Sequence, residues 1–405
     1  MSTRAPSTAQ LPVGFQASGT TCGIKVSGKS DLALFVSDRD ATATGVFTTN
    51  KVCGAPVIVS KQRVPSTTAR AVIINSGNSN AATGEPGIRD AKIMTAAVAE
   101  QIGCSAESVS VCSTGVIGVP LPMTVILKGI PQGVQSLGKS DKHLLDAATA
   151  MMTTDTFPKL TSVDVAVAGG NVRVSGVCKG AAMIAPNMAT MLSVVMTDAQ
   201  LTTEQSDSAL RFGVDRTFNC ISVDGHMSTS DTVLLLANGA SGGQLSDGDF
   251  ANVREAIQQV CQKLATDIIR DAEGADHFIT IDVTGLETRD AAYRMAKEIA
   301  DSALVKTAVA GGDPNWGRIV SAAGYANVDF DTAYVSLHIN GIEVYRAGTP
   351  VPFDAADLSK QLKTNRDVHL KLSVAGGPCS GKESVRFWTS DLTQEYVRLN
   401  SEYTT

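Results

Sequence analysis

Short runs of β-branched and apolar residues alternate along the chain with segments whose apolar residues recur every three to four positions. The β-branched runs predict strands, because branched side chains pack well on a pleated surface. They cover residues 32–36, 57–60, 71–75, 108–112, 163–168 and 171–178. The helical spacing covers residues 90–102, 141–152, 203–218, 250–269 and 289–302. This mixed order predicts a layered α/β or α+β body.

The C-terminal half carries a second, shorter pattern of the same kind. Residues 276–375 follow the order strand, helix, strand, strand, helix, strand, which predicts a smaller α+β domain. Its predicted strands are residues 278–283, 334–339, 343–346 and 369–375. Residues 391–399 then have a helix-like spacing of apolar side chains. A helix there would dock the end of the chain onto the body.

Residues 75–84 (NSGNSNAATG) follow a predicted strand and are dense in Asn, Ser and Gly. This composition predicts a loop that offers many hydrogen-bonding groups, and an ordinary turn has the same signature. The sequence contains neither the G-x-G-x-x-G pattern nor the G-x-x-x-x-G-K-[ST] pattern. The two commonest nucleotide-binding motifs are therefore excluded.

Charge and hydropathy narrow the class of protein. The formal net charge is −6, and no block of five or more basic residues occurs, which argues against nucleic-acid binding. Residues 1–16 lack a basic segment followed by an apolar one, and no apolar run approaches the ~18 residues of a membrane-spanning helix. We expect a soluble, cytoplasmic protein that acts on small molecules and has neither a nucleic-acid nor a membrane partner.

Cysteine and histidine spacing gives no sign of a metal site. The eight cysteines include no C-x-x-C pair, which fits buried thiols better than a disulfide framework. The five histidines form neither an H-x-x-x-H pair nor a mixed cluster with cysteine. We therefore expect no metal site.

The most informative stretch lies near the middle of the chain. Residues 179–192 (KGAAMIAPNMATML) place Thr190 directly after the small residue Ala189. A threonine that becomes N-terminal gains an α-amine with a near-neutral pKa, which can serve its own hydroxyl as a general base. The local pattern alone favours an ordinary strand residue, because Thr190 opens a β-branched run that ends at residue 197.

Several separated motifs, taken together, favour a nucleophile at Thr190 over an ordinary strand residue. Residues 179–192 match the pattern K-G-x-G-M-x-x-P-x-[ML]-A-T-[ML]-L, except that Ala182 stands where the second glycine is usual. Further motifs follow the same family in order, at residues 111–118 (VCSTGVIG), 152–156 (MTTDT), 271–274 (DAEG), 313–318 (DPNWGR) and 400–405 (NSEYTT). In these features the chain resembles the ornithine acetyltransferase family of arginine biosynthesis. Ser230 is a second departure, at a position where many members have asparagine.

The resemblance implies a fold and a maturation step. The fold is an αββα-type sandwich of the N-terminal-nucleophile kind, which the family shares with certain aminopeptidases. Self-cleavage between Ala189 and Thr190 divides the chain into an α chain, residues 1–189, and a β chain, residues 190–405. The smaller domain of about residues 276–375 belongs to the β chain. Two copies of each associate as a cytoplasmic heterotetramer.

The resemblance also implies an activity, glutamate N-acetyltransferase, which moves acetyl from N2-acetyl-L-ornithine to L-glutamate by a ping-pong mechanism through acetyl-Thr190. It requires no cofactor, and acetyl-coenzyme A remains open as a second acetyl donor. Thr114 and Gly115 would stabilise the oxyanion. The substrate-contacting positions implied are Thr153, Lys179, Thr190, Glu273, Asn400 and Thr405.

Three alternatives remain open at this stage. A related N-terminal-nucleophile aminopeptidase or amidase would share the cleavage and hydrolyse its acyl-enzyme. A Ser/His/Asp hydrolase would use His226, Ser228 and Asp231, although residues this close in sequence do not normally meet as a triad. A silent scaffold would keep the bond between Ala189 and Thr190 intact.

Overall fold

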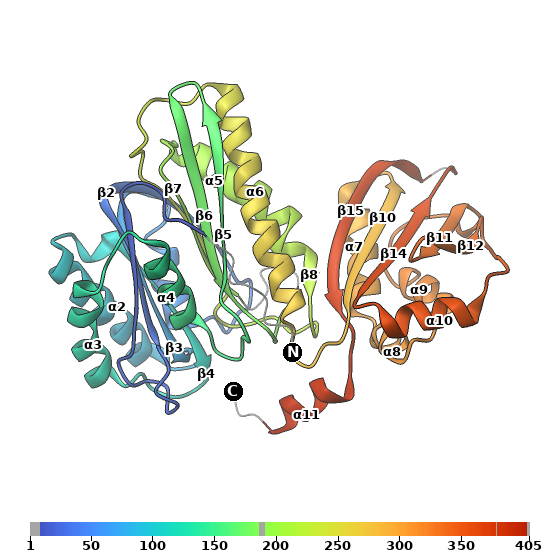
Figure 1. Cartoon of the computed structure of the whole chain (residues 1–405), viewed down its shortest axis with the longest axis horizontal. Coiled ribbons are helices and arrows are strands. Elements are labelled where there is room, and N and C mark those ends of the chain that lie inside the picture. The colour runs from blue at the N-terminus through green and yellow to red at the C-terminus, as the bar shows by residue number, and fades with distance from the viewer. Residues whose placement is uncertain (1–8, 186–190, 378, 403–405) are drawn as a thin grey trace.

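Two β-sheets and the helices packed on them make up the described part of the chain (Figure 1). The structure is a computed structural model that describes residues 9–185, 191–377 and 379–402. The mixed α/β class predicted from the sequence is confirmed. No helix among these residues is both long and apolar enough to cross a membrane.

The first sheet comes mainly from the N-terminal half. Its strand order is β4 (Val109–Val116), β3 (Ser66–Asn78), β2 (Leu32–Phe47), β9 (Thr232–Ala237), β7 (Leu192–Thr197), β6 (Gly170–Lys179) and β5 (Lys159–Val167), and β1 (Phe15–Thr20) pairs with β2. The accompanying helices are α1 (Ala55–Lys61), α2 (Gly84–Ile102), α3 (Met123–Gln135), α4 (Asp141–Met151), α5 (Thr203–Arg216) and α6 (Asp247–Arg270).

The second sheet lies beside α6 (Figure 1). Its order is β13 (Thr349–Pro350), β12 (Ile342–Arg346), β11 (Val335–Ile339), β14 (Asp367–Val374), β10 (Phe278–Leu286), β15 (Ser380–Ser390) and β8 (Ile221–Ser222). Its helices are α7 (Arg289–Asp301), α8 (Ala303–Gly311), α9 (Trp316–Ala323) and α10 (Ala355–Thr364), and α11 (Gln394–Glu402) follows β15.

Alternation along the strands gives the first sheet two buried faces. Val194 on β7 belongs to the cluster formed with α4, whereas its neighbour Val195 belongs to the cluster formed with α5 and α6. Successive side chains of a strand point to opposite faces, so a run of apolar residues is buried on both sides. This burial explains the consecutive apolar residues 194–196 in β7 and 233–237 in β9.

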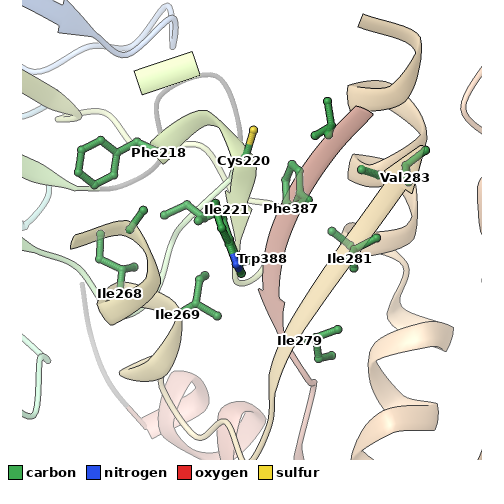
Figure 2. Packing of buried hydrophobic residues seen from close by; sticks show 14 of the residues in the cluster. Phe218, Cys220, Ile221, Ile268, Ile269, Ile279, Ile281, Val283, Phe387 and Trp388 are labelled. Carbon is green, nitrogen blue, oxygen red and sulfur yellow. The ribbon is translucent and has the colours of Figure 1, made fainter. Parts of the chain in front are cut away.

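One continuous core connects the two sheets. The short strand β8 follows α5 in sequence but pairs in parallel with the end of β15. Phe387 and Trp388 of β15 pack close to Ile221 of β8, and Ile268 and Ile269 at the end of α6 lie in the same cluster (Figure 2). The second sheet is therefore fixed against the first by buried apolar contacts.

Two local predictions are wrong. Residues 57–60 belong to helix α1 and not to a strand. Pro56 lies in the first turn, where proline favours a helix, and an apolar run this short carries no distinguishing period. The loop expected at residues 75–84 starts later, since β3 continues to Asn78. There the polar side chains are buried and hydrogen-bonded within the protein: Asn75 donates to the Asn78 carbonyl at 2.9 Å, and Ser76 donates to the Ala150 carbonyl at 2.5 Å.

Helix α11 brings the end of the chain back below the two sheets (Figure 1). The helix predicted at residues 391–399 is confirmed with a shift of three residues. Gly274 has φ +64°, and a Cβ atom there would lie 2.4 Å from the backbone nitrogen of Tyr396. Close docking of α11 therefore requires glycine at this position.

Candidate active site

A cavity of about 230 Å³ opens between the ends of β4 and β6 and the first turns of α11. Six of the predicted site residues line it, namely Thr114, Gly115, Thr153, Lys179, Glu273 and Asn400. They come from positions as far apart as 114 and 400, so the fold brings the separated motifs together. Ala189, Thr190 and Thr405 lie outside the described residues.

The strand register explains how Thr114 and Gly115 reach the cavity. β3 and β4 are parallel, and Ser76 and Gly77 of β3 lie opposite Thr114 and Gly115 of β4. Gly115 has φ +133°, and a Cβ atom on it would lie 2.3 Å from the carbonyl carbon of Gly77. Any other residue would push the two strand ends apart, so the close approach requires glycine here.

The ammonium group of Lys179 lies at the buried side of the cavity. Its Nζ donates to Thr114 Oγ1 at 3.1 Å, and the side chain is almost fully buried. Burial lowers the pKa of Lys179, while the nearby Asp155 carboxylate acts in the opposite direction. Because an ammonium has only donors, the Thr114 oxygen accepts this bond and its own hydrogen remains available to another acceptor.

A buried ion triad connects the segment around Thr153 with the end of β6, where Lys179 lies. Lys159 Nζ lies 2.6 Å from Asp155 Oδ1 and 2.5 Å from Asp271 Oδ2, and all three side chains are buried. Asp155 also accepts the backbone N–H of Thr153 at 3.0 Å and that of Gly180 at 2.7 Å. The triad thus fixes the segment around Thr153 relative to the segment around Gly180, and both lie at the cavity.

The pKa values of the two carboxyl groups of the triad are shifted in opposite directions. Burial alone would raise the pKa of Asp155, but the ammonium groups of Lys159 and Lys179 hold it well below its ordinary value. The pKa of Asp271 is raised, because burial outweighs the attraction of Lys159. The pKa of Lys159 is raised by both carboxylates despite its burial.

Asp224 fixes the chain before the predicted junction. Its carboxylate accepts the backbone N–H groups of Met183 at 2.7 Å and Ile184 at 2.9 Å. Tyr396 of α11 donates its hydroxyl to the same carboxylate at 3.1 Å, and burial together with Asp224 raises the pKa of this hydroxyl. Helix α11 is thereby connected to the segment that leads into residues 186–190.

The chain after the predicted junction is held between two strands. Leu192 of β7 lies opposite Lys179 of antiparallel β6 and opposite Thr232 of parallel β9. The Met191 backbone N–H donates to Asp231 Oδ1 at 3.0 Å, and its carbonyl accepts the N–H of Thr232 at 3.1 Å. Thr190 therefore directly precedes a residue whose backbone is held on both sides.

Opposite charges face the same cavity. The backbone N–H of Glu273 donates to the Ala181 carbonyl at 2.9 Å, which brings Glu273 beside the segment that follows Lys179. Asn400 donates its amide to Glu273 Oε2 at 3.3 Å. The cavity thus offers both a cation and an anion to a charged substrate.

The two departures from the family pattern both line the cavity. Ala182 is not among the residues with positive φ, so its methyl group causes no backbone strain of the kind that would require glycine. Ser230 lies next to the Asp231 carboxyl, and its backbone N–H donates to Ser228 Oγ at 3.0 Å.

The residues of the alternative hydrolase do not assemble as a triad. Ser228 Oγ accepts from Ser230, and Asp231 Oδ1 accepts from Met191. Among the described residues, the ring of His226 has no hydrogen bond to either side chain. Within the same residues, no group of three or more His, Cys, Asp and Glu side chains is arranged to hold a metal ion.

Four further residues line the cavity that the sequence did not identify as site residues, namely Ser79, Ile117, Asp224 and Tyr396. Asp224 and Tyr396 are 172 positions apart, and nothing in their local sequence pairs them. Ser79 belongs to the Asn- and Ser-rich stretch that was expected to offer hydrogen-bonding groups, so composition gave a partial signal there.

Comparison with known proteins agrees with this arrangement. A model of the ArgJ family matches residues 16–405. The arginine biosynthesis bifunctional protein ArgJ of Rhodopirellula baltica is 46% identical and covers 98% of this chain and 96% of its own. The protein of the same name from Caldanaerobacter subterraneus is 44% identical, with 98% of both chains covered.

A solved structure is similar as well. The crystal structure of the arginine biosynthesis bifunctional protein ArgJ from Bacillus halodurans aligns with a TM-score of 0.50 and 37% identity, over 53% of this chain and 100% of that one. The matched family model and the two relatives extend over nearly the whole sequence. The chain therefore belongs to the ArgJ family.

Proposed function

We propose that this protein is a glutamate N-acetyltransferase that moves acetyl from N2-acetyl-L-ornithine to L-glutamate in arginine biosynthesis. The observation that carries the proposal is the cavity that gathers Thr114, Gly115 and Lys179 close to β7, the strand that begins two residues after Thr190. The relatives in Rhodopirellula baltica and Caldanaerobacter subterraneus are named as arginine biosynthesis proteins, which supports the same pathway.

Thr190 is the proposed nucleophile, and self-cleavage exposes it. The Thr190 hydroxyl attacks the Ala189 carbonyl carbon, the C–N bond breaks as the acyl group moves to oxygen, and water hydrolyses the resulting ester. The released α-amine then serves the hydroxyl as a general base. The Bacillus halodurans chain aligns in full with 53% of this chain, and residues 190–405, which are 216 of 405, make up the same share.

Turnover uses the same hydroxyl. Thr190 Oγ attacks the acetyl carbonyl of acetylornithine, the amine takes the hydroxyl proton, and the departing ornithine nitrogen receives it. The glutamate amine then attacks the acetyl ester and releases acetylglutamate with the free hydroxyl. No cofactor enters either half-reaction, and acetyl-coenzyme A would act on the first as an alternative acetyl donor.

Thr114 and Gly115 are the proposed oxyanion donors. Lys179 already donates to the Thr114 oxygen, so the Thr114 hydroxyl hydrogen is free to donate to a developing negative charge. A preorganised donor of this kind acts most strongly in the transition state, because the charge develops there. The Lys179 ammonium lies nearby and also stabilises the developing negative charge electrostatically.

Thr114→Ala is expected to slow both self-cleavage and acetyl transfer, because one donor set serves both tetrahedral intermediates. The expected loss in kcat is about ten- to a thousand-fold, with a smaller change in KM. Thr114→Ser keeps the hydroxyl and should retain most of the rate. The rate of chain separation on denaturing gels and steady-state kinetics measure the two effects. Equal rates for Thr114→Ala and the unsubstituted protein would remove Thr114 from the oxyanion site.

The substrate side chains differ in charge, and the cavity contains partners for both. Lys179 would pair with a carboxylate and Glu273 with an ammonium, while Thr153, Asn400 and Thr405 would complete the hydrogen bonds. Since the two substrates of a ping-pong reaction bind in turn, each uses the partner of opposite charge. We also propose that the α and β chains, residues 1–189 and 190–405, associate as a cytoplasmic heterotetramer of two of each.

A quenched single-turnover experiment tests the function. Intact mass should first show two chains that separate at Ala189–Thr190. Incubation with N2-acetylornithine should then add one acetyl group to Thr190, which tandem mass spectrometry locates, and glutamate should discharge it faster than water. Discharge mainly by water would favour the aminopeptidase or amidase alternative. An intact chain that turns over would exclude the proposed nucleophile.

A further inference from the structure

Asp231 is a buried carboxyl group hydrogen-bonded to Met191, the residue that follows the proposed nucleophile, and the reaction described above does not use it. It directly precedes β9 and is fully buried. β9 runs parallel to β7, and Thr232 lies opposite Leu192. This register brings Asp231 beside Met191, the residue after Thr190.

The two oxygens of Asp231 have different surroundings. Oδ1 accepts the Met191 backbone N–H at 3.0 Å. Oδ2 is buried, and no donor among the described residues makes a hydrogen bond of normal geometry to it, although Ser228 lies near enough to lower the pKa of the carboxyl group. The side chain also lines a small gap that it shares with Thr114, Lys179 and Ser230. A buried oxygen without a partner costs stability, so its retention beside a reactive group points to a function.

Covalent connectivity relates this carboxyl group to Thr190. The Met191 nitrogen is bonded to the carbonyl carbon of Thr190, and the Thr190 nitrogen and Cβ are each three bonds away from it. A side chain that holds the Met191 nitrogen therefore restrains the backbone that carries both the nucleophilic hydroxyl and its base. The unpartnered Oδ2 belongs to the same rigid carboxyl group.

We propose that Asp231 is a positioning residue for Thr190, which it orients through hydrogen bonds and without contributing a negative charge. The inference rests on Thr190 being the nucleophile, as proposed above. It adds a residue that acts on Thr190 from the segment just before β9, through the Met191 backbone, in maturation as well as in acetyl transfer.

The surroundings of Asp231 favour the neutral, protonated form of its carboxyl group. Burial raises the pKa of Asp231 well above its ordinary value, and the Met191 N–H, the nearby Ser228 and the Lys179 ammonium on β6 together offset only part of this effect. A carboxylate next to the Thr190 amine would form an ion pair with the ammonium form and raise its pKa, which would hinder its action as a base. A protonated carboxyl group leaves the amine free to titrate near neutrality.

Asp231→Asn and Asp231→Ala separate the two possibilities, because asparagine is a neutral isostere that keeps both an acceptor and a donor. Asp231→Asn should mature, and its kcat and pH profile should stay within about three-fold of the unsubstituted protein. Asp231→Ala should lower the cleavage rate and kcat by about ten-fold or more at a nearly unchanged KM. Asp198→Ala is the matched control.

Asp198 is a buried carboxylate beyond the opposite end of β7, where it accepts the backbone N–H groups of Val13 and Arg173. Its loss should lower the melting temperature but leave kcat unchanged. If Asp231→Ala gives no soluble protein, Asp231→Ser replaces it with the same expected loss. A difference infrared spectrum of the unsubstituted protein against Asp231→Asn should show the C=O band of a protonated carboxyl group.

Four results would overturn the inference: no effect of Asp231→Ala, an Asp231→Asn protein as impaired as Asp231→Ala, an Asp231→Asn protein that does not fold, or the absence of the infrared band. Failure of the proposed function looks different. It would show in the unsubstituted protein, as an intact chain or an acetyl label elsewhere, before any change at Asp231 is made.

Discussion

A Thr190→Ala variant is expected to remain one uncleaved chain and to lose acetyl transfer by about a thousand-fold or more. The substitution removes the hydroxyl that attacks in both reactions. Because the chain is then not cut, the α-amine that acts as base is not released either. Intact-mass analysis measures cleavage, and formation of ornithine from acetylornithine measures transfer.

Folding should survive this change, which makes the result interpretable. Met191, just before β7, and Leu192, its first residue, are buried, and their hydrogen bonds involve backbone atoms and Asp231. Thr190→Ser is the matched control, since it keeps a hydroxyl and should still cleave and transfer at a reduced rate. Cleavage of Thr190→Ala at the same bond would show that another group performs the attack.

Much of the layered architecture could be predicted from residue patterns. The strand expected at residues 171–178 corresponds to β6, and the helix expected at residues 141–152 corresponds to α4. Long periodic segments bury one face and therefore carry a clear signal. The segment of residues 57–60 carries no such signal, because a single turn of apolar residues fits a helix as well as a strand.

The motifs predicted which residues gather, but not what holds them. Thr114, Lys179 and Glu273 lie in separate sequence motifs and line one cavity in the structure. Their support depends on long-range pairs, such as Lys159 with Asp271 and Asp224 with Tyr396, which lie 112 and 172 positions apart. Contacts between residues this distant depend on strand register and helix docking, which a single sequence does not determine.

Lys159→Met is the second large effect expected, and it acts on stability. The lysine ammonium lies 2.6 Å from Asp155 and 2.5 Å from Asp271, with all three side chains buried. Methionine has a similar length but leaves two buried carboxyl groups without their cation. Removing one partner of a buried ion pair costs about 3–5 kcal/mol, because the remaining charge is neither solvated nor neutralised.

The exposed pair of Lys142 and Asp146 provides the matched control. Lys142 Nζ lies 2.5 Å from Asp146 Oδ2, but the Lys142 side chain is 77% exposed. Lys142→Met should change the free energy of unfolding by about 0–1 kcal/mol, since solvent screens such pairs. Both variants are best compared in the Thr190→Ala background, where the protein is one chain and unfolding does not depend on the association of two fragments.

The effect of Lys159→Met should also depend on pH with a definite sign. In the unsubstituted protein the pKa of Asp155 is held below its ordinary value, so this carboxylate contributes stability above the pKa of the unfolded chain and loses it as the pH falls. Without Lys159, the pKa of Asp155 rises, although Lys179 and the Gly180 N–H still oppose burial there, and the pKa of Asp271 rises further above its ordinary value. The folded state of the variant therefore binds more protons than that of the unsubstituted protein. Relative to the unsubstituted protein, stability contributed by these carboxyl groups then falls as the pH rises, and the destabilisation by Lys159→Met should be larger at pH 7 than at pH 5. Urea denaturation at the two pH values measures the difference. Equal unfolding midpoints for Lys159→Met and Lys142→Met at pH 7 would show that the triad does not stabilise the fold around the site.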